Sequence, residues 1–243
     1  MTQEVLFDRN LLRLNRERAS KNFAQHNFMH HEVANRIAEN VEFLNRNFEN
    51  VLEIGAYDNY LRDLLIGKTK QYDFHVDEEV LSVKKSYDLI LSNLNLHYIN
   101  QIPQFLLQVK EILNPNGVFI ASFFGEENLS QLAHVLYETE NEIYNGVSPR
   151  MPPTIDVKTA ANLLAKAGFQ NPISDFAKIE VEYEDPLNLL KDLKMMGQGN
   201  ILVKRSRKFF TKEFLEKISK NYRKMYPDGV ATFEVVTVTG WKI

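Results

Sequence analysis

The chain has 243 residues, a hydrophobic share of 44%, a formal net charge of −3 and no cysteine. This length suits one large α/β domain or one domain with an appended lobe. The charge argues against a general nucleic-acid binder, and the lack of thiols excludes disulfides, zinc–thiolate sites and thiol catalysis. No apolar run reaches the roughly 20 residues of a membrane span, and "MTQEVLFDRNLLRLNRERAS" at the N-terminus does not resemble a secretory signal. We therefore expect a soluble, cytoplasmic protein.

The first half of the chain alternates between helical and strand patterns. Apolar residues spaced for one buried face predict helices, and short apolar or alternating runs predict strands. In chain order we expect helices over 8–24 and 28–45, a strand over 51–54, a helix that Asp58 caps and Gly67 ends, strands over 72–76 and 86–94, a helix opened by Pro103, and a strand over 118–124. This alternation indicates an α/β fold with a mostly parallel sheet and helices on both of its faces.

The second half is less regular. We expect a helix over 127–143, a loop over 145–154, a helix capped by Asp156, a strand over 178–184, a helix begun by Asp185-Pro186, a helix over 211–225 and a final strand over 231–243. Two late strands separated by inserted helices predict an antiparallel edge and a helical lid. We therefore divide the chain into N-terminal helices (1–45) and a main domain (46–243) with a lid insertion over about 126–155 and 185–225.

The stretch "VLEIGAYDNY" (51–60) joins a short apolar strand to an amphipathic helix through an acid and a glycine. Backbone N–H groups in such a loop, and at the N-terminus of the following helix, can face a charged ligand group. Glycine is needed where a side chain would occupy ligand space or where φ is positive. Gly55 meets that need, whereas Tyr57 and Asn59 stand where further glycines are usual. The stretch fits either a cofactor loop or an ordinary strand–turn–helix junction.

Several segments, in order, resemble the class I S-adenosylmethionine (SAM) methyltransferase fold. They are the strand–acid–x–Gly segment, "YDLILSNLNLHYI" and "LNPNGVFIASFF". The resemblance narrows to one branch, the mitochondrial respiratory complex I assembly factor described as an arginine hydroxylase, with its bacterial relatives. It rests on segments spread over nearly the whole chain, among them "LFDRNLLR", "DEEVL", "GVSPRMPP", "LLAKAGF", "DLKMMGQGN" and "YRKMYPDGVATFEV". The resemblance implies a Rossmann-like fold with SAM as cofactor.

The same resemblance implies where SAM would lie. Glu53 and Gly55 would face its methionine end, while Asp77 and Glu78, in "DEEVL", would lie at the adenine edge. Asn93 ends a buried strand at the carboxyl edge of the sheet, where ligands bind in such folds, and would hydrogen-bond an amino group of ligand or substrate.

His97 and Tyr98 follow the same strand and are the candidate catalytic residues. The alternative for His97 is that of a packed, hydrogen-bonded core residue.

The connection between the strands at 51–54 and 86–92 is shorter than the family fold requires. A βαβ unit takes roughly 30 residues, so the two units expected here need roughly 60, whereas residues 55–85 number 31. We predict a sheet one strand short of the usual seven, with the strand whose terminal acid holds the ribose missing or truncated. Asp73 and Asp77 are the residues that could replace the acid that holds the ribose. Together with Tyr57, this shortening predicts weak or absent SAM binding.

Three further patterns carry weaker signals. His26, His30 and His31 beside Glu32 place two imidazoles one helical turn apart, and "HVD" (75–77) with His134 has the composition of an iron triad. Neither histidine pattern belongs to the family motifs, so we predict no metal site. The basic stretch "VKRSRKFFTK" (203–212) suits a solvated surface, docking to an acidic protein or, last, nucleic acid.

Three functions remain open. The first is a SAM-methyltransferase-like hydroxylase or methyltransferase that modifies a complex I subunit. The second is a non-catalytic assembly factor with a degenerate SAM site, and the third is a small-molecule or carrier-protein O-methyltransferase. For the first two we expect a groove for a protein partner lined by Arg150, Met195, Met196 and Tyr226; the alternative is that these segments only pack the lid onto the sheet.

Overall fold

The computed structural model describes residues 5–77, 79–208 and 210–243, and the chain divides into two compact units. Unit 1 comprises Met1–Asn27, Glu127–Pro153 and Lys178–Glu234, and unit 2 comprises Phe28–Glu126, Thr154–Ala177 and Val235–Ile243. Each unit is thus assembled from three separate stretches of chain.

A six-stranded sheet with the order β2-β1-β3-β4-β6-β5 is the framework of unit 2. Its strands are β1 (Phe48–Ile54), β2 (Thr69–His75), β3 (Tyr87–Asn93), β4 (Leu113–Phe124), β5 (Gln170–Glu182) and β6 (Val230–Lys242). β1 pairs in parallel with β2 and β3, and β3 pairs in parallel with β4, whereas β6 runs antiparallel to β4. Residues 178–182 of β5 and 230–234 of β6 belong to unit 1.

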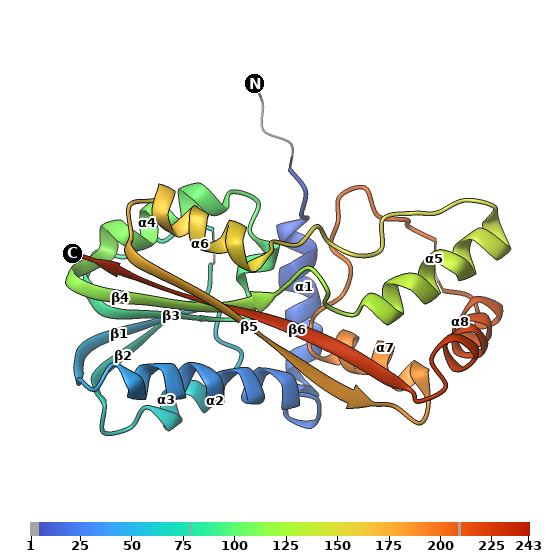
Figure 1. The fold of residues 1–243 in the computed structure, drawn as a ribbon, viewed down its shortest axis with the longest axis horizontal. Helices are drawn as coiled ribbons and strands as arrows, with labels where there is room; N and C mark the ends of the chain where they lie inside the picture. The colour runs from blue at the N-terminus through green and yellow to red at the C-terminus, as the bar shows by residue number, and fades with distance from the viewer. Residues whose placement is uncertain (1–4, 78, 209) are drawn as a thin grey trace. The chain divides into compact units, whose positions relative to one another are not determined.

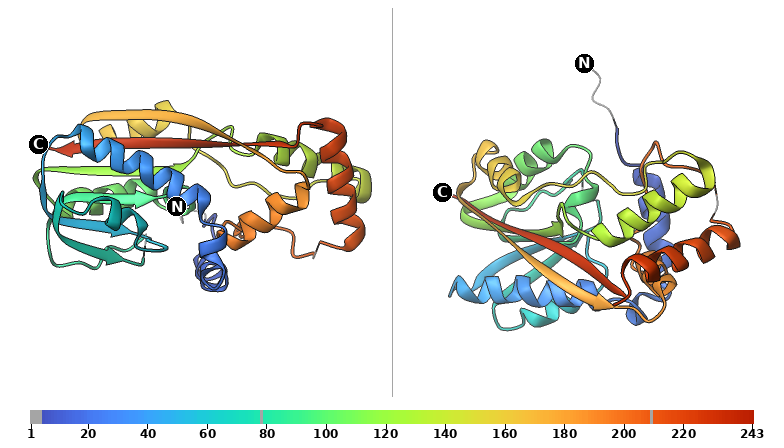
Figure 2. Two further views of the ribbon diagram at one scale, coloured as in Figure 1. Left: turned by 90° about the horizontal axis from the view of Figure 1, so that it is seen from below. Right: turned by 45° about the vertical axis from the view of Figure 1, so that its right-hand side comes forward.

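Helices cover both faces of this sheet, as predicted. α2 (Phe28–Phe43) runs along one face with α3 (Tyr60–Leu64) beside it, and α4 (Ile102–Ile112) and α6 (Val157–Lys166) lie on the other (Figures 1 and 2). α4 begins with a proline in its first turn, and the Asp156 side chain accepts the Thr159 N–H at the start of α6. The buried side of α4 reaches the sheet where the Phe105 ring meets the Phe119 ring edge-on.

The sheet confirms the predicted loss of one strand from the usual seven. Between Gly55 and Lys85 the described residues form one helix, α3, and one strand, β2. The prediction that the ribose-holding strand is missing or truncated is wrong, because β2 has seven residues and pairs along its length with β1. The strand that is lacking would have lain outside β2, which forms the edge of the sheet.

Unit 1 is mainly helical and contains both segments of the expected lid. Its helices are α1 (Arg9–Ser20), the 3₁₀ turn η1 (Phe23–Gln25), α5 (Ser130–Tyr144), α7 (Pro186–Met195) and α8 (Lys212–Met225). α8 begins at the Thr211 cap and buries Phe214, Ile218 and Tyr222, whose spacing of four residues puts them on one face. No helix in the described part of the chain is long and apolar enough to span a membrane.

Candidate functional site

A small pocket lies in unit 2 where β1 and β3 end beside the first turns of α2. Its lining residues come from α2, β1, the loop after it, α3 and β3: His30, His31, Ala34, Glu53, Gly55, Ala56, Tyr57, Asp58, Leu61 and Asn93. Parallel pairing of Ile54 with Ser92 sets the ends of the two strands side by side. The fold therefore brings together three of the residues expected at the SAM site, Glu53, Gly55 and Asn93.

Glu53 is a buried acid with a shifted ionisation. Its side chain is 3% exposed, and the Tyr72 hydroxyl donates a hydrogen bond of 2.8 Å to its Oε2. Burial raises the pKa of Glu53 from 4.5 to about 7, with the Tyr72 hydrogen bond acting in the opposite direction. Near neutral pH this carboxyl exchanges readily between its neutral and ionised forms, so it can respond to a charged ligand group.

Gly55 turns the chain out of β1 with a φ of 74°, a conformation that favours glycine. Its N–H donates to the His75 carbonyl at 2.8 Å, which continues the pairing of β1 with β2 by one residue. On the other side the buried Asn95 side chain donates from Nδ2 to the carbonyls of Ile54 (3.1 Å), Gly55 (3.3 Å) and Asn93 (2.8 Å). The turn is thus held from both neighbouring strands.

Sequence reasoning missed Asn95. The available signal was the second asparagine of "SNLNL", which comes directly after Leu94, a buried residue with a φ of 55°. A leucine rarely takes this left-handed conformation.

Asn93 offers a hydrogen-bond acceptor inside the pocket. Its Nδ2 donates to the His30 carbonyl at 2.9 Å, and its Oδ1 is buried with no hydrogen-bond donor among the described residues. A buried polar atom left without a partner costs about 1–3 kcal/mol. An amino group of a ligand would satisfy this oxygen, so Asn93 fits the role expected from the sequence.

Tyr57 limits the space beside these groups. Tyr57 is among the residues that line the pocket, and its ring is tilted against the ring of His30, another lining residue, with centroids 4.5 Å apart. The remaining cavity is about 10 Å³, roughly the space of one water molecule. Asn59, the other departure from the glycine pattern, has a φ of −95°, so glycine is not required at its position.

The acids expected near the ribose and adenine lie outside this pocket's lining. Asp77 is exposed, and its Oδ1 accepts the N–H groups of Glu79 (2.8 Å) and Val80 (3.2 Å) in a local turn. Glu78 lies outside the described residues. Asp73 Oδ2 pairs with Lys85 Nζ at 3.0 Å.

The candidate catalytic residues His97 and Tyr98 belong to the 3₁₀ turn η2 (Leu96–Tyr98) and are both buried. The His97 ring packs against the rings of Tyr98 and Phe124, at centroid distances of 4.2 and 5.0 Å. The Phe124 N–H points to His97 Nδ1 at 3.5 Å. Neither residue lines the pocket, and the surroundings of His97 are those of a packed core residue.

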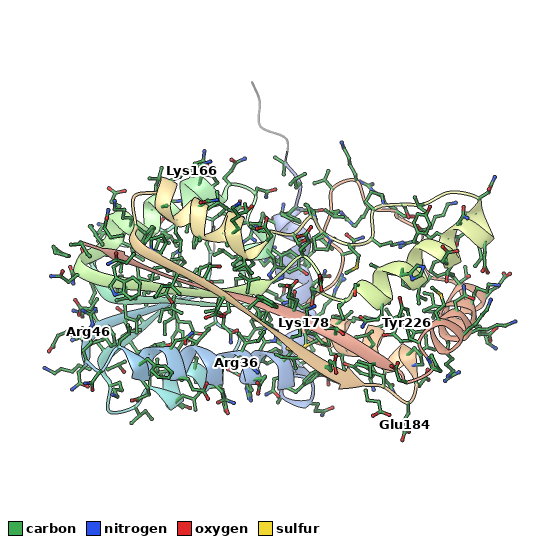
Figure 3. All side chains as sticks on the ribbon, viewed as in Figure 1. Arg36, Arg46, Lys166, Lys178, Glu184 and Tyr226 are labelled. Carbon is green, nitrogen blue, oxygen red and sulfur yellow. The ribbon has the colours of Figure 1, made fainter. Side chains whose placement is uncertain are left out.

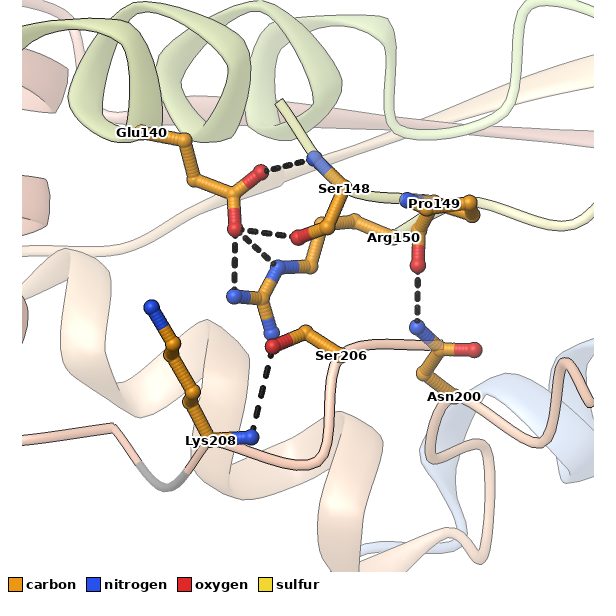
Figure 4. A network of polar contacts seen from close by, with 7 residues as sticks. All are labelled: Glu140, Ser148, Pro149, Arg150, Asn200, Ser206 and Lys208. Atoms are coloured by element: carbon orange, nitrogen blue, oxygen red, sulfur yellow. Dashed lines mark hydrogen bonds and ion pairs between the residues drawn. The ribbon is translucent and has the colours of Figure 1, made fainter. Parts of the chain in front are cut away.

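A buried ion pair fixes the loop after α5 to the helix α5 itself (Figure 4). Glu140, 2% exposed, accepts hydrogen bonds from the N–H and Oγ of Ser148 and from Nε and Nη2 of Arg150, at 2.5–2.9 Å. Burial alone would raise the pKa of Glu140, but these hydrogen bonds and the guanidinium outweigh it, and the pKa lies below its ordinary value. The Arg150 guanidinium also stacks over the rings of Phe210 and Phe214.

The other residues expected in a partner groove have different surroundings. Met196 is 0% exposed, so its side chain does not lie at a surface groove as predicted, and Arg150 is occupied by Glu140. Met195 is half-buried. Tyr226 is labelled in Figure 3 and follows α8. Its hydroxyl hydrogen-bonds His134 Nδ1 at 3.0 Å, and the residue is half-buried. Substitutions of Arg150 and Met196 would therefore disturb the interior of unit 1 rather than test a groove.

The histidines considered as metal ligands have other partners. His26 Nδ1 lies 2.6 Å from Asp192 Oδ1, His31 Nε2 lies 2.8 Å from Asp58 Oδ2, and His75 Nε2 hydrogen-bonds the Val80 carbonyl. Within residues 5–77, 79–208 and 210–243, no group of three or more histidine, aspartate or glutamate side chains is arranged to hold a metal ion.

The sheet order, the glycine turn after β1 and the pocket beside β3 define a class I methyltransferase domain, and a family model described as "Methyltransferase domain" matches residues 29–172. Over 271 aligned residues the chain is 32% identical to human "Arginine-hydroxylase NDUFAF5, mitochondrial", covering 98% of this chain and 77% of that protein. The chain therefore belongs to the class I SAM-dependent methyltransferase family, in the branch that contains the NDUFAF5 arginine-hydroxylases. SAM is the cofactor of this family.

Two further likenesses are less extensive in sequence. The chain is 28% identical over 183 residues to the malonyl-[acyl-carrier protein] O-methyltransferase of Gallionella capsiferriformans, covering 73% of this chain and 60% of that enzyme. The crystal structure of the YcgJ protein of Bacillus subtilis superposes with a TM-score of 0.52 at 11% identity, covering 87% of this chain and 98% of YcgJ. The second likeness shows the fold alone.

Proposed function

We propose that this protein binds SAM and modifies an arginine side chain of a respiratory-complex subunit. The observation that supports this best is the extent of the similarity to the human arginine-hydroxylase, which covers 98% of the chain and so includes unit 1 as well as the cofactor half. The likeness to the carrier-protein methyltransferase covers less of the chain at lower identity. A protein substrate is therefore favoured over a carrier-bound acid.

The pocket in unit 2 fits one end of SAM in chemistry but not in size. The Asn93 Oδ1 and the Glu53 carboxyl are acceptors for an ammonium group, and Gly55 keeps the turn free of a side chain. Tyr57 occupies space beside them, and the cavity of about 10 Å³ is too small for an amino-acid moiety. We infer that the protein binds SAM weakly and only after a local rearrangement.

Calorimetry with SAM tests this proposal. We expect a Kd well above the micromolar range for the wild-type protein and tighter binding by Tyr57→Gly, which removes the ring. Low-micromolar binding by the wild-type protein, about −8 kcal/mol, would contradict the proposed obstruction by Tyr57.

The chemical change found in the substrate identifies the reaction. Hydroxylation of a C–H bond requires an oxygen-activating centre, whereas methylation transfers the methyl group of SAM. Mass spectrometry of respiratory-complex subunits from a wild-type and a deletion strain distinguishes the two: an arginine peptide gains one oxygen atom, gains one methyl group or stays unchanged. An unchanged set of subunits whose assembly still fails in the deletion strain would identify a non-catalytic assembly factor instead.

We also propose that unit 1, which holds residues 127–153 and 185–225 of the expected lid, supplies the surface for the protein partner. Val147 and Tyr137 are exposed on it, unlike Met196. Val147→Asp should reduce copurification of the modified subunit while leaving the melting temperature unchanged. Equal recovery would argue against this surface.

A cytoplasmic location is proposed as well, because a chain without cysteine suits a reducing compartment.

A further inference from the structure

The buried Glu53 carboxyl is held at one of its two oxygens. The Tyr72 hydroxyl, on the neighbouring strand β2, donates to its Oε2 at 2.8 Å. Val51 pairs with Tyr72 and Glu53 pairs with Phe74, so this hydrogen bond runs diagonally between β1 and β2. Within the described residues the other oxygen, Oε1, receives no hydrogen bond. A carboxylate accepts hydrogen bonds at both oxygens, so half of the capacity of this buried group is unused.

The unused oxygen belongs to a residue that lines the pocket. Asn93, whose Oδ1 has no donor among the described residues, lines it too. Two buried acceptors in one pocket suit a ligand group with several N–H donors and a positive charge, such as an ammonium group. An ionised Glu53 attracts that group, whereas a neutral Glu53 carries no charge and has a hydroxyl that donates. Ligand binding therefore depends on whether Glu53 holds a proton.

We propose that Tyr72 is a positioning residue for this ligand group: its hydroxyl holds Oε2 of Glu53 and leaves Oε1 to accept the ammonium group. This inference rests on the proposed SAM site and concerns how binding at that site is controlled. Burial raises the pKa of Tyr72 far above its ordinary value, so the hydroxyl keeps its proton throughout the neutral range. Its hydrogen bond favours the ionised carboxylate over the neutral acid, and Tyr72 thus sets the pH at which the pocket can hold an ammonium group.

Other charged groups act on the same carboxyl. Besides Tyr72, four titratable or charged side chains influence Glu53 or line its pocket: Asp58, Arg62, His30 and His31. Burial is the largest influence and raises the pKa of Glu53 to about 7, and the Tyr72 hydrogen bond opposes it. The aspartate, in the loop after β1, raises this pKa further and the arginine of α3 lowers it, each by less. Histidine side chains also titrate near neutral pH, so a test of Glu53 needs a variant that separates its proton from theirs.

The pH dependence of binding, measured by NMR titration with two ligands, tests this role. S-adenosylhomocysteine carries an ammonium group, whereas 5′-methylthioadenosine has the same nucleoside without the amino-acid end. From pH 6 to pH 7 the wild-type affinity for S-adenosylhomocysteine should rise about fivefold, because the ionised share of a carboxyl with a pKa of about 7 rises by that factor. The affinity for 5′-methylthioadenosine should not follow the Glu53 proton.

Tyr72→Phe is the decisive variant, because it removes the hydroxyl and keeps the ring that contacts the Phe74 ring. Its rise in affinity should lie about one pH unit or more higher than in wild type, and its affinity at pH 7 should be about fivefold lower. Tyr60→Phe is the matched control, since it removes a hydroxyl that donates to Asn35 at 3.2 Å instead. In Glu53→Gln the rise should vanish, and any pH dependence that remains belongs to the two histidines.

NMR of the isotope-labelled Glu53 carboxyl in the free protein tests Tyr72 without any ligand. The pKa of Glu53 should be about 7 in wild type, unchanged in Tyr60→Phe and higher in Tyr72→Phe. Equal titration in wild type and Tyr72→Phe would overturn the role of Tyr72. A wild-type affinity for S-adenosylhomocysteine that stays constant from pH 6 to pH 8 would also overturn it and leave the proposed SAM site standing. Absence of binding of both ligands to wild type and Tyr57→Gly alike would overturn the SAM site, and with it the control of its ligand by Tyr72.

Discussion

Glu53→Gln tests whether burial raises the pKa of the acid at the pocket. Glutamine has nearly the same shape and keeps an oxygen that can accept the Tyr72 hydroxyl, which donates to Glu53 at 2.8 Å. The substitution removes the ionisation alone. Any change in how stability depends on pH can therefore be assigned to the carboxyl group.

The expected size follows from the pKa of Glu53, which burial raises from 4.5 to about 7. Between these values the folded chain holds a proton that the unfolded chain has released, so the free energy of unfolding falls by about 1.36 kcal/mol per pH unit. The contribution of this group is fully present below pH 4.5 and is lost as the pH rises through 7. From pH 5 to pH 7 the loss is about 2 kcal/mol, because the folded group is already half ionised at pH 7.

Urea unfolding followed by Trp241 fluorescence measures this loss, because the chain has one tryptophan and it pairs with Val118 inside the unit 2 sheet. The stability difference between wild type and Glu53→Gln should fall by about 2 kcal/mol between pH 5 and 7 and level off about one pH unit higher. Glu49→Gln, on the same strand but exposed and paired with Lys70, should show no such trend. Parallel curves for wild type and Glu53→Gln would refute the argument.

Three further substitutions test other parts of the structure. Arg150→Ala leaves the Glu140 carboxylate buried without its guanidinium and should lower the free energy of unfolding by about 3–5 kcal/mol, measured by far-UV circular dichroism in urea. Asn95→Leu removes the donor shared by three carbonyls and should lower the free energy of unfolding by about 1–3 kcal/mol, measured by Trp241 fluorescence. It should also lower the affinity for SAM. Gly240→Ala places a Cβ about 3.0 Å from Cβ and Cδ1 of the buried Phe169 side chain and should lower the free energy of unfolding by about 1–3 kcal/mol in the same assay.

The helix starts were the most predictable part of the fold, because they depend on local chemistry. Asp156, Asp185 and Pro103 stand at or near the first turns of their helices, as their residue types indicate. Asp58 was expected to cap α3, but Asn59 occupies the cap position and the Asp58 side chain also pairs with His31. That pairing joins residues 27 positions apart, and no local pattern carries it.

The first half of β5 was not predicted from the sequence, again because it depends on structure distant along the chain. Residues 170–177 include Pro172, which argues against a strand in the interior of a sheet. β5 lies at the edge of the sheet, where a proline is tolerated, and it extends from Gln170 to Glu182 instead of starting at 178. Its place in the sheet order depends on the whole topology, so the residues of the strand do not reveal it.

Part of the pocket could be predicted and part could not. Glu53 and Asn93 end strands that a parallel α/β fold places side by side, so sequence order was enough to bring them together. His30 and His31 were considered as metal ligands and set aside, and no sequence pattern predicted a place for them at the pocket. In the structure both residues line the pocket, because the first turns of α2 lie beside the ends of β1 and β3.

Tyr57 and Asp58 join the unusual loop to α2. The Tyr57 ring, in the place of a usual glycine, packs on the His30 ring, and Asp58 pairs with His31 at 2.8 Å. If these neighbouring contacts restrict the pocket together, Tyr57→Gly and Asp58→Asn act on the same obstacle. The double variant should then gain less affinity for S-adenosylhomocysteine than the product of the two single gains, with a coupling of about 0.5–1 kcal/mol for neighbouring residues. Titration calorimetry of the four proteins in the cycle measures this coupling, and gains that multiply fully would show that the ring and the ion pair obstruct the ligand independently.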